Sequence, residues 1–360
     1  MIAKPAEYSL VSKQTSKLLF FGLFCLVLFA FMMPTKASAQ RDSGLKECIP
    51  IKLSFIQPWG TDYFPSHQLW YSELLSLQRL GVDEVVFQWA VWGPELSQDI
   101  QLPVWMEAAV AQAKQSGTKI WFGLRYDPSF IEKLKTEGQP YLNRRLEETR
   151  LLANALKAHI HHSTHPDEVF AGWYIPDEID GRLLLDSKLR LLLTQYATQT
   201  RDVLREVLPG PVAISGYADL KVEPLKLASH WNNLMSRSSI DILFLQDGLG
   251  AKLMEPNSSR SLQRAISLAF RAQTHRVIPV IEIFEIDPRT VEFRTIPTTM
   301  NTMKSRLENA RSAPDQPVAL FSLSSHVLRF DNKHSRDIEE FLAHNAQLCG
   351  NTDGSDPKNE

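Results

Sequence analysis

Apolar and polar residues follow two different periods that take turns along the chain. Short runs rich in β-branched and aromatic residues have the pattern of buried strands, and the stretches between them carry apolar residues at the spacing of amphipathic helices. Several helical stretches end in glycine or in a proline-containing turn, which are helix stop signals. The strand-like runs cover residues 51–59, 84–92, 119–127, 169–178, 211–217, 241–247, 277–285 and 317–323.

Regular alternation of strand and helix predicts parallel strands joined by crossover helices, either as a closed barrel or as an open doubly wound sheet. Eight units in about 300 residues match a (β/α)8 barrel. No glycine-rich phosphate loop follows the first strand, which disfavours a nucleotide-binding sheet. We therefore predict an α/β fold, a single (β/α)8 TIM barrel over residues 40–348, with a disordered tail at 349–360.

Residues 1–39 have the layout of a secretory signal peptide. Three lysines precede an uncharged apolar run from Leu18 to Met33, and small residues follow at Ala37 and Ala39. We expect cleavage after Ala39, which places the mature chain in the periplasm or outside the cell. The run is shorter than the roughly 20 residues of a spanning helix. An inner-membrane protein anchored through an uncleaved segment is the alternative.

Removal of the signal peptide makes the chain more acidic. The segment carries four lysines and one glutamate, a net +3, so the formal charge changes from −2 to −5. An acidic chain without basic runs is a poor candidate for nucleic acid, because phosphate neutralisation dominates that binding. We expect a neutral or cationic partner, no membrane contact after cleavage, and a monomer.

The two cysteines that remain after cleavage, Cys48 and Cys349, lie just before the first strand and at the end of the last helix. Export places both in an oxidising compartment. Barrel closure brings the last helix beside the first strand, so we expect a disulfide between them.

Functional groups of a barrel gather at the carboxyl ends of its strands. In this chain those ends are rich in carboxylates, amides and aromatic rings, which bind sugars through hydroxyl hydrogen bonds and through the apolar face of the ring. We predict a carbohydrate ligand, no cofactor and no metal. The predicted substrate-binding residues are Gln57, Trp59, Gln88, Trp92, Arg125, Tyr126, Asp177, Tyr217, Gln246, Asp247, Glu285 and His326.

Cleavage of a glycosidic bond requires two carboxylates across a pocket. Glu178 and Glu282 come at the ends of the fourth and seventh strand-like runs. Because strand neighbours point to opposite faces, Asp177 and Glu178 cannot both face the lumen of a regular barrel, and Trp173 should pack outward if Glu178 points inward. A loop carboxylate that caps a helix or pairs with an arginine is the alternative interpretation of each residue.

Six short motifs at successive strand ends, FIQPW, VVFQWAVWG, GWYIPDEID, ISGY, LFLQDGLG and IEIFE, resemble the bacterial domain-of-unknown-function family forty-four thirty-four over residues 51–330. That family is regarded as part of the TIM-barrel glycoside hydrolase superfamily. The resemblance implies a retaining hydrolase with Glu178 as acid/base and Glu282 as nucleophile. Many enzymes of the superfamily have asparagine immediately before the acid, where this chain has Asp177.

Two other functions fit the same sequence. One is a catalytically silent carbohydrate-binding barrel that assists polysaccharide handling, and the other is a hydrolase of a different polar substrate. A histidine-rich segment at 159–165 precedes a strand and so belongs at the amino-terminal face, where we expect a solvated helix end and no metal site.

Overall fold

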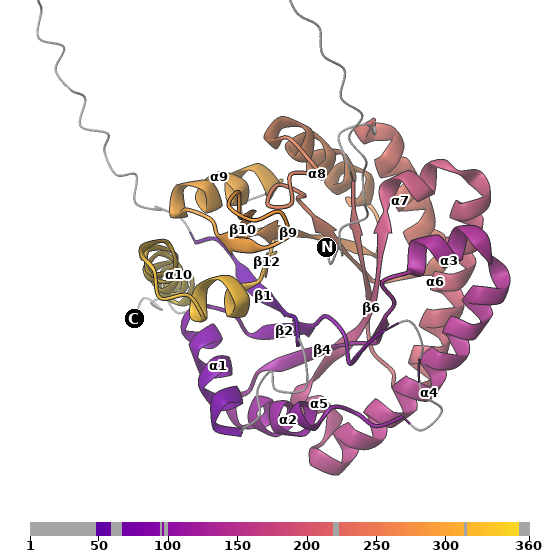
Figure 1. Cartoon of the computed structure of the whole chain (residues 1–360), viewed down its shortest axis with the longest axis horizontal. Coiled ribbons are helices and arrows are strands. Elements are labelled where there is room, and N and C mark those ends of the chain that lie inside the picture. Colours follow the sequence, from indigo (N-terminus) through magenta and orange to yellow (C-terminus); the bar gives the residue numbers. More distant parts are fainter. Residues whose placement is uncertain are drawn as a thin grey trace, which may run out of the picture.

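The computed structural model describes residues 48–58, 67–93, 96, 100–218, 223–312 and 315–352. Eight parallel strands close into a barrel in the order β1-β12-β9-β8-β7-β6-β4-β2 (Figure 1). The predicted (β/α)8 TIM barrel is confirmed. The barrel strands are β1 (Ile51–Ile56), β2 (Glu84–Phe87), β4 (Lys119–Gly123), β6 (Phe170–Asp180), β7 (Val212–Tyr217), β8 (Ile242–Gln246), β9 (Arg276–Glu282) and β12 (Val318–Phe321).

A ring of helices surrounds the barrel, and one long helix follows each of its strands (Figure 1). These eight are α1 (His67–Arg79), α2 (Val104–Ser116), α4 (Gln139–Ser163), α6 (Ser187–Val207), α7 (Pro224–Ser238), α8 (Pro256–Phe270), α9 (Met300–Ala310) and α10 (Lys333–Thr352). Short helices α3 (Phe130–Thr136) and α5 (Pro166–Val169) precede α4 and β6. α10 extends beyond residue 348, the predicted end of the domain, and residues 353–360 lie outside the described part of the chain.

Three of the predicted strands are interrupted at their carboxyl ends. Run 84–92 divides into β2 and β3 (Val91–Trp92), run 119–127 into β4 and β5 (Arg125–Tyr126), and run 277–285 into β9 and β10 (Phe284–Ile286). β3 pairs with β5, and β10 pairs with β11 (Thr295–Pro297), in two small sheets outside the barrel. Each of these three runs therefore leaves the barrel at the point where its predicted site residues begin.

Large aromatic side chains fill the lumen. The rings of Phe55 and Phe244 meet edge-on at a centroid distance of 5.4 Å, and Tyr174 packs edge-on against both at 5.7 and 5.9 Å. Trp173, the neighbour of Tyr174, belongs to the cluster between strands and helices and donates its indole N–H to the Leu208 carbonyl at 3.0 Å. The predicted outward packing of Trp173 is confirmed, and the lumen is a packed core up to its carboxyl end.

The two ends of the described chain meet at the amino-terminal face, where the strands begin. A disulfide joins Cys48, just before β1, to Cys349 in α10, with 4.9 Å between their Cα atoms. The Asn345 side chain also exchanges hydrogen bonds of 2.8 and 2.9 Å with the backbone of Ile49. The last helix is thus fastened to the first strand at one edge of the barrel.

The predicted signal peptide lies outside the described residues. Within residues 48–352, as far as the structure describes them, no helix has the length and hydropathy that a membrane crossing requires.

Candidate functional site

Three glutamines and one glutamate form a hydrogen-bonded chain at the carboxyl end of the barrel. Gln57 donates its amide N–H to Gln88 Oε1 at 2.8 Å, and Gln88 donates in turn to Glu178 Oε1 at 3.0 Å. Gln246 donates to the same Glu178 oxygen at 2.9 Å. The donation from Gln57 fixes the orientation of the Gln88 amide, so the network positions one carboxylate from two sides.

Strand alternation explains why these four residues meet. The lumen contains Phe55 of β1, Val86 of β2, Tyr174 of β6 and Phe244 of β8. Gln57, Gln88 and Gln246 each lie two residues after the inward residue of their strand, and Glu178 lies four residues after Tyr174, so all four face the same way. The structure therefore brings together the predicted residues Gln57, Gln88, Glu178 and Gln246. Glu178 is 8% exposed, so its carboxylate lies at the opening of the lumen without being free in solvent.

Asp177 points to the other side of β6. Its carboxylate accepts hydrogen bonds from the Arg145 guanidinium at 2.8 and 2.9 Å and from the Tyr196 hydroxyl at 2.7 Å. The residue is only 2% exposed. These contacts attach the end of β6 to α4 and α6, and they argue against the predicted contact between Asp177 and a sugar.

Arg125 also lies in a buried ion network outside the lumen. Its guanidinium donates to Glu148 at 2.6 and 3.0 Å and to the Gly93 carbonyl at 2.5 Å, and it lies 3.4 Å from Asp127. With 1% exposure, the side chain is committed to holding β5 against α4. The predicted role of Arg125 in sugar binding finds no support in this geometry.

Aromatic side chains border the opening on the β3 and β5 side. Trp92 is 41% exposed, Trp89 is buried, and the Trp89 ring lies 5.8 Å from that of Tyr126. Burial, and next the charge of Glu178, raise the pKa of Tyr126 above its usual range, so its hydroxyl stays protonated. Tyr217, at the end of β7, is half-buried. Trp59, the other predicted platform, lies outside the described residues.

Glu282 occupies the last position of β9 and has the inward parity of Ile278 and Val280. Its carboxylate is covered by the loop between β8 and α8, residues 248–254, which we name the covering loop. The Ala251 N–H donates to Glu282 Oε2 at 2.9 Å, and the side chain is 2% exposed. A methyl group at Gly250 would come within 3.1 Å of the same oxygen, so the backbone of the loop lies directly on the carboxylate.

Burial raises the pKa of the Glu282 carboxyl, and the Ala251 N–H and the Arg306 guanidinium partly oppose that shift. Arg306 donates to the carbonyls of Glu282 and Phe284 and lies on the outer side of β9. A carboxyl in this setting keeps its proton to a higher pH than an exposed glutamate.

Asp247 lies beside Glu282 but on the outward face of β8. Its Oδ1 accepts from the Leu249 N–H at 3.2 Å and from the Glu282 N–H at 3.3 Å, whereas its buried Oδ2 has no hydrogen-bond partner among the described residues. Burial, reinforced by the neighbouring Glu282 charge, raises the pKa of Asp247 well above its usual range. Asp247 thus links the start of the covering loop to the backbone of Glu282.

The remaining predicted residues, Glu285 and His326, have partners of their own. Glu285 forms an ion pair with Arg306 at 2.5 Å and accepts from Thr298 at 3.1 Å. His326 Nε2 lies 2.9 Å from the Thr295 hydroxyl, and its ring stacks on Phe284. Burial lowers the pKa of His326 to about 4, which leaves the imidazole neutral at physiological pH.

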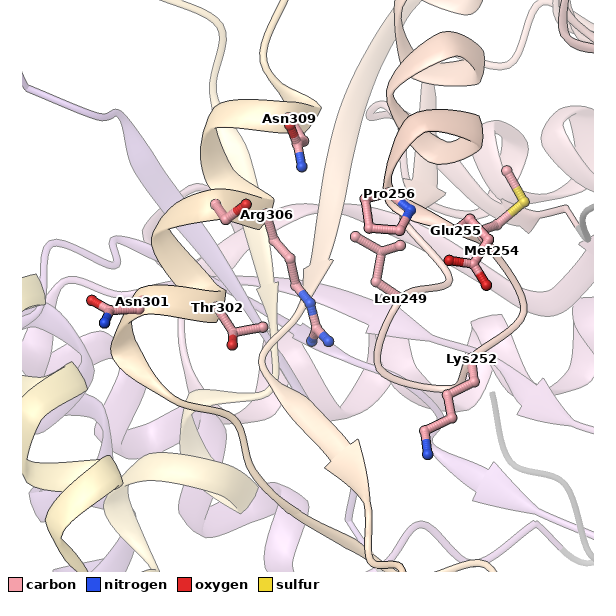
Figure 2. A pocket seen from close by; sticks show the side chains of 10 residues that line it. Leu249, Lys252, Met254, Glu255, Pro256, Asn301, Thr302, Arg306 and Asn309 are labelled. Atoms are coloured by element: carbon pink, nitrogen blue, oxygen red, sulfur yellow. The ribbon is translucent and has the colours of Figure 1, made fainter. Parts of the chain in front are cut away.

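A cavity of about 510 Å³ separates the covering loop from α9. Figure 2 shows the Arg306 side chain extending from α9 into this space, with Leu249 and Lys252 of the loop opposite. Two loop residues have backbone angles in the left-handed region, Gly248 at φ 66° and Lys252 at φ 58°. The loop therefore has open space on its α9 side and a left-handed backbone conformation at Gly248 and at Lys252.

The sequence motifs predicted Glu178 and its amide partners as site residues, but they did not predict the covering loop or Arg306. The motif LFLQDGLG contains Gly248 and Gly250, and Gly250 allows the loop backbone to approach Glu282 closely. These glycines are the feature of the sequence from which the covering loop could have been predicted. In the described part of the chain, no cluster of three or more histidine, cysteine, aspartate or glutamate side chains could hold a metal ion.

Solved structures share this barrel at low sequence identity. A proposed alpha-L-fucosidase from Bacteroides thetaiotaomicron VPI-5482 has a TM-score of 0.66 at 15% identity, covering 89% of this chain and 99% of that one. The catalytic domain of beta-amylase from Paenibacillus polymyxa has a TM-score of 0.53 at 9% identity, covering 83% and 99% of the two chains. At such identities the likeness shows the fold alone.

Sequence comparisons place the chain more closely. The "Uncharacterized protein YbcH" of Escherichia coli (strain K12) is 28% identical over 214 residues, which are 58% of this chain and 68% of that protein. Residues 51–333, well over half of the chain, match the family model described as a domain of unknown function (DUF4434). The chain is therefore a member of the DUF4434 family.

Proposed function

We propose that the protein is a glycoside hydrolase that cleaves a poly- or oligosaccharide with Glu178 and Glu282 as its two carboxylates. The observation that carries this proposal is the placement of Glu178, which faces inward at the carboxyl end of β6 and is held by the amides of Gln88 and Gln246. In barrel enzymes this end of the strands carries the chemistry. The barrels of the fucosidase and amylase named above lend support from the fold.

In the proposed reaction Glu178 protonates the leaving oxygen while the Glu282 carboxylate attacks the anomeric carbon and forms a covalent glycosyl-enzyme. Water, deprotonated by Glu178, then displaces Glu282 from the same carbon, and the two displacements together retain the configuration. That assignment requires the two carboxyl groups to lie about 5–5.5 Å apart in the substrate complex, whereas about 6.5–9.5 Å would leave room for a water and give inversion. Trp92 offers an exposed ring on which the apolar face of a sugar can stack.

Attack by Glu282 requires the covering loop to move. The Ala251 N–H occupies Oε2, and the side chain is nearly inaccessible. We propose that the loop moves outward into the cavity in front of α9 when substrate binds. This motion ends the burial that raises the pKa of Glu282, so the carboxyl ionises and can act as the nucleophile.

We also propose that the enzyme works outside the cytoplasm. The Cys48–Cys349 disulfide supports this location, because such bonds persist in oxidising compartments.

A catalytically silent carbohydrate-binding barrel is the second candidate function. One observation favours it, the burial of Glu282 beneath the Ala251 amide. In that case the glutamine chain and the aromatic residues would hold a sugar that is never cleaved.

The deciding experiment measures hydrolysis of a panel of aryl glycosides and oligosaccharides by the full chain. Glu178→Gln should reduce cleavage of substrates with poor leaving groups by about 10²- to 10⁴-fold and spare activated aryl glycosides. Glu282→Gln should abolish both activities, and Glu132→Gln, an exposed carboxylate on α3, serves as the matched control. Sugar binding without any turnover by the unmodified chain would instead establish the silent barrel.

A further inference from the structure

A second large cavity lies at the amino-terminal face of the barrel, at the opposite end from Glu178 and Glu282. It has a volume of about 630 Å³ and lies between the second half of α8, the segment that leads into β9, the residues after α9 and the residues before β12. Arg276 begins β9, and Glu282 ends the same strand, so the length of the barrel separates the two sites.

Arginine dominates the charge of this cavity, which we name the arginine cavity. Among the residues that the structure describes, four arginines line it and no aspartate or glutamate does. The one histidine in the lining, His275, is buried, and this burial lowers its pKa, so it adds no charge at neutral pH. The arginines are Arg264, Arg271, Arg276 and Arg311.

Three of these arginines, Arg264, Arg271 and Arg276, have exposed side chains at the cavity. Within the residues that the structure describes, Arg264, Arg271 and Arg276 form no ion pair, whereas Arg145 and Arg205 each bind a carboxylate at 2.8–2.9 Å. Like charges that converge on one concavity repel one another and focus a positive potential there. A bound anion offsets that repulsion.

The donor set fits an oxyanion with several acceptor oxygens. A guanidinium presents its N–H groups as a planar fork that matches carboxylate and phosphate, and the three arginines without an ion pair supply more positive charge than a single carboxylate neutralises. The lining also contains Ser267, whose buried hydroxyl has no hydrogen-bond partner among the described residues. A phosphate group, with up to two negative charges and three free oxygens, satisfies both features.

The arginine cavity lies on the same face of the barrel as the two ends of the described chain. The amino-terminal face also carries Cys48, and the apolar run 18–33 precedes that residue in the sequence. Leu268, 59% exposed, adds an apolar side chain to the same lining. Arginines beside an exposed leucine suit the phosphate of an anionic lipid headgroup, and a soluble phosphate is the other source of the same chemistry.

We propose that the arginine cavity is a phosphate-binding site, separate from the carbohydrate site at the other end of the barrel. This site binds a phosphate group through Arg264, Arg271 and Arg276.

Calorimetric titration of the full chain with inorganic phosphate at low ionic strength tests the site. The double variant Arg271→Ala/Arg276→Ala should weaken binding by roughly tenfold or more, because each charge-assisted hydrogen bond contributes on the order of a tenfold factor. The matched control, Arg79→Ala/Arg237→Ala, removes two exposed arginines from the last turns of α1 and α7 on the same face. It should leave phosphate binding unchanged.

A second arm compares full-chain binding to vesicles of phosphatidylglycerol and of phosphatidylcholine. If the double variant loses the preference for phosphatidylglycerol and the control keeps it, the phosphate belongs to a lipid headgroup. If the double variant loses only inorganic phosphate, the ligand is a soluble phosphate. Equal affinity of the unmodified chain and the double variant for inorganic phosphate, or no binding by either, would overturn the proposal.

Discussion

At the carboxyl end of the barrel, the environment of a side chain depends on which face of its strand it lies on. Glu178 points into the lumen and accepts hydrogen bonds from two amides, while its neighbour Asp177 is fixed by Arg145 and Tyr196. The two residues are adjacent in sequence and serve different purposes. Glu178 faces the lumen, and Asp177 anchors the strand that presents it.

Asp247 gives a prediction about stability. Since burial and Glu282 raise its pKa in the folded state, the folded protein keeps a proton that the unfolded chain loses near pH 4. The free energy of unfolding should therefore fall as the pH rises above 4 and through the raised pKa. Asp247→Asn preserves the acceptor for the Leu249 and Glu282 N–H groups and removes that titration.

Urea unfolding at pH 4 and pH 8 measures this effect. We expect Asp247→Asn to be more stable than the unmodified chain by about 1–2 kcal/mol at pH 8 and nearly equal to it at pH 4. A variant that is less stable at pH 8 would show that Asp247 is ionised in the folded protein.

Trp92 gives a prediction about affinity. If its exposed ring stacks on a sugar, Trp92→Ala should weaken oligosaccharide binding by about 0.5–1.5 kcal/mol, measured by calorimetry. Tyr71→Ala removes an aromatic residue of similar exposure from α1 and is the control. Equal losses in both variants would contradict the platform assignment.

Elements around the site combine a rigid strand with a loop that has room to move. β9 presents Glu282 from the packed barrel, whereas the covering loop rests on it through the hydrogen bond from Ala251 to the carboxylate and through the close approach of Gly250. The cavity behind the loop gives it space on the α9 side. In the proposed reaction this site is closed before substrate binds and opens when substrate binds.

Gly250→Ala tests the loop. The added methyl group would lie 2.6 Å from the Phe284 carbonyl and 3.0 Å from Glu282 Cβ, so the loop must lift away from β9. We expect carbodiimide labelling of Glu282, followed by mass spectrometry, to increase severalfold, with a loss of about 1–3 kcal/mol in stability. Gly350→Ala in α10, where a methyl group meets nothing within 4 Å, is the control. Unchanged labelling in Gly250→Ala would mean that the loop does not control access.

The sequence was sufficient for the barrel because each of its eight units repeats a local pattern of strand and helix. Alternation along β6 also predicted that Glu178 and Trp173 would lie on opposite faces, as they do. The environments of Arg125 and Glu282 could not be predicted in this way. The first depends on Glu148, 23 residues away, and the second on Ala251, 31 residues away. Contacts of that range are set by tertiary packing and leave no periodic signal.

At the scale of the whole molecule, the disulfide closes almost the entire described chain into one loop. It joins residues 301 positions apart, and the chain-entropy model assigns such a cross-link about 5–6 kcal/mol. Cys48→Ser/Cys349→Ser should therefore lower the free energy of unfolding by up to this amount, with little change in activity. The measurement is urea unfolding of the variant beside the unmodified chain. Unchanged stability would show that the Asn345 contacts with Ile49 alone fasten the ends.

The same disulfide decides how the molecule responds to mechanical load. Consider a pulling force applied to residues outside the cross-link, with the chain gripped before Cys48 and after Cys349. The tension would pass from one sulfur to the other. The hydrogen bonds between β1 and β12, where the barrel closes, would carry none of it. Under oxidising conditions the barrel could then be stretched between its ends without being opened, and a reducing agent would be needed before its seam came under load.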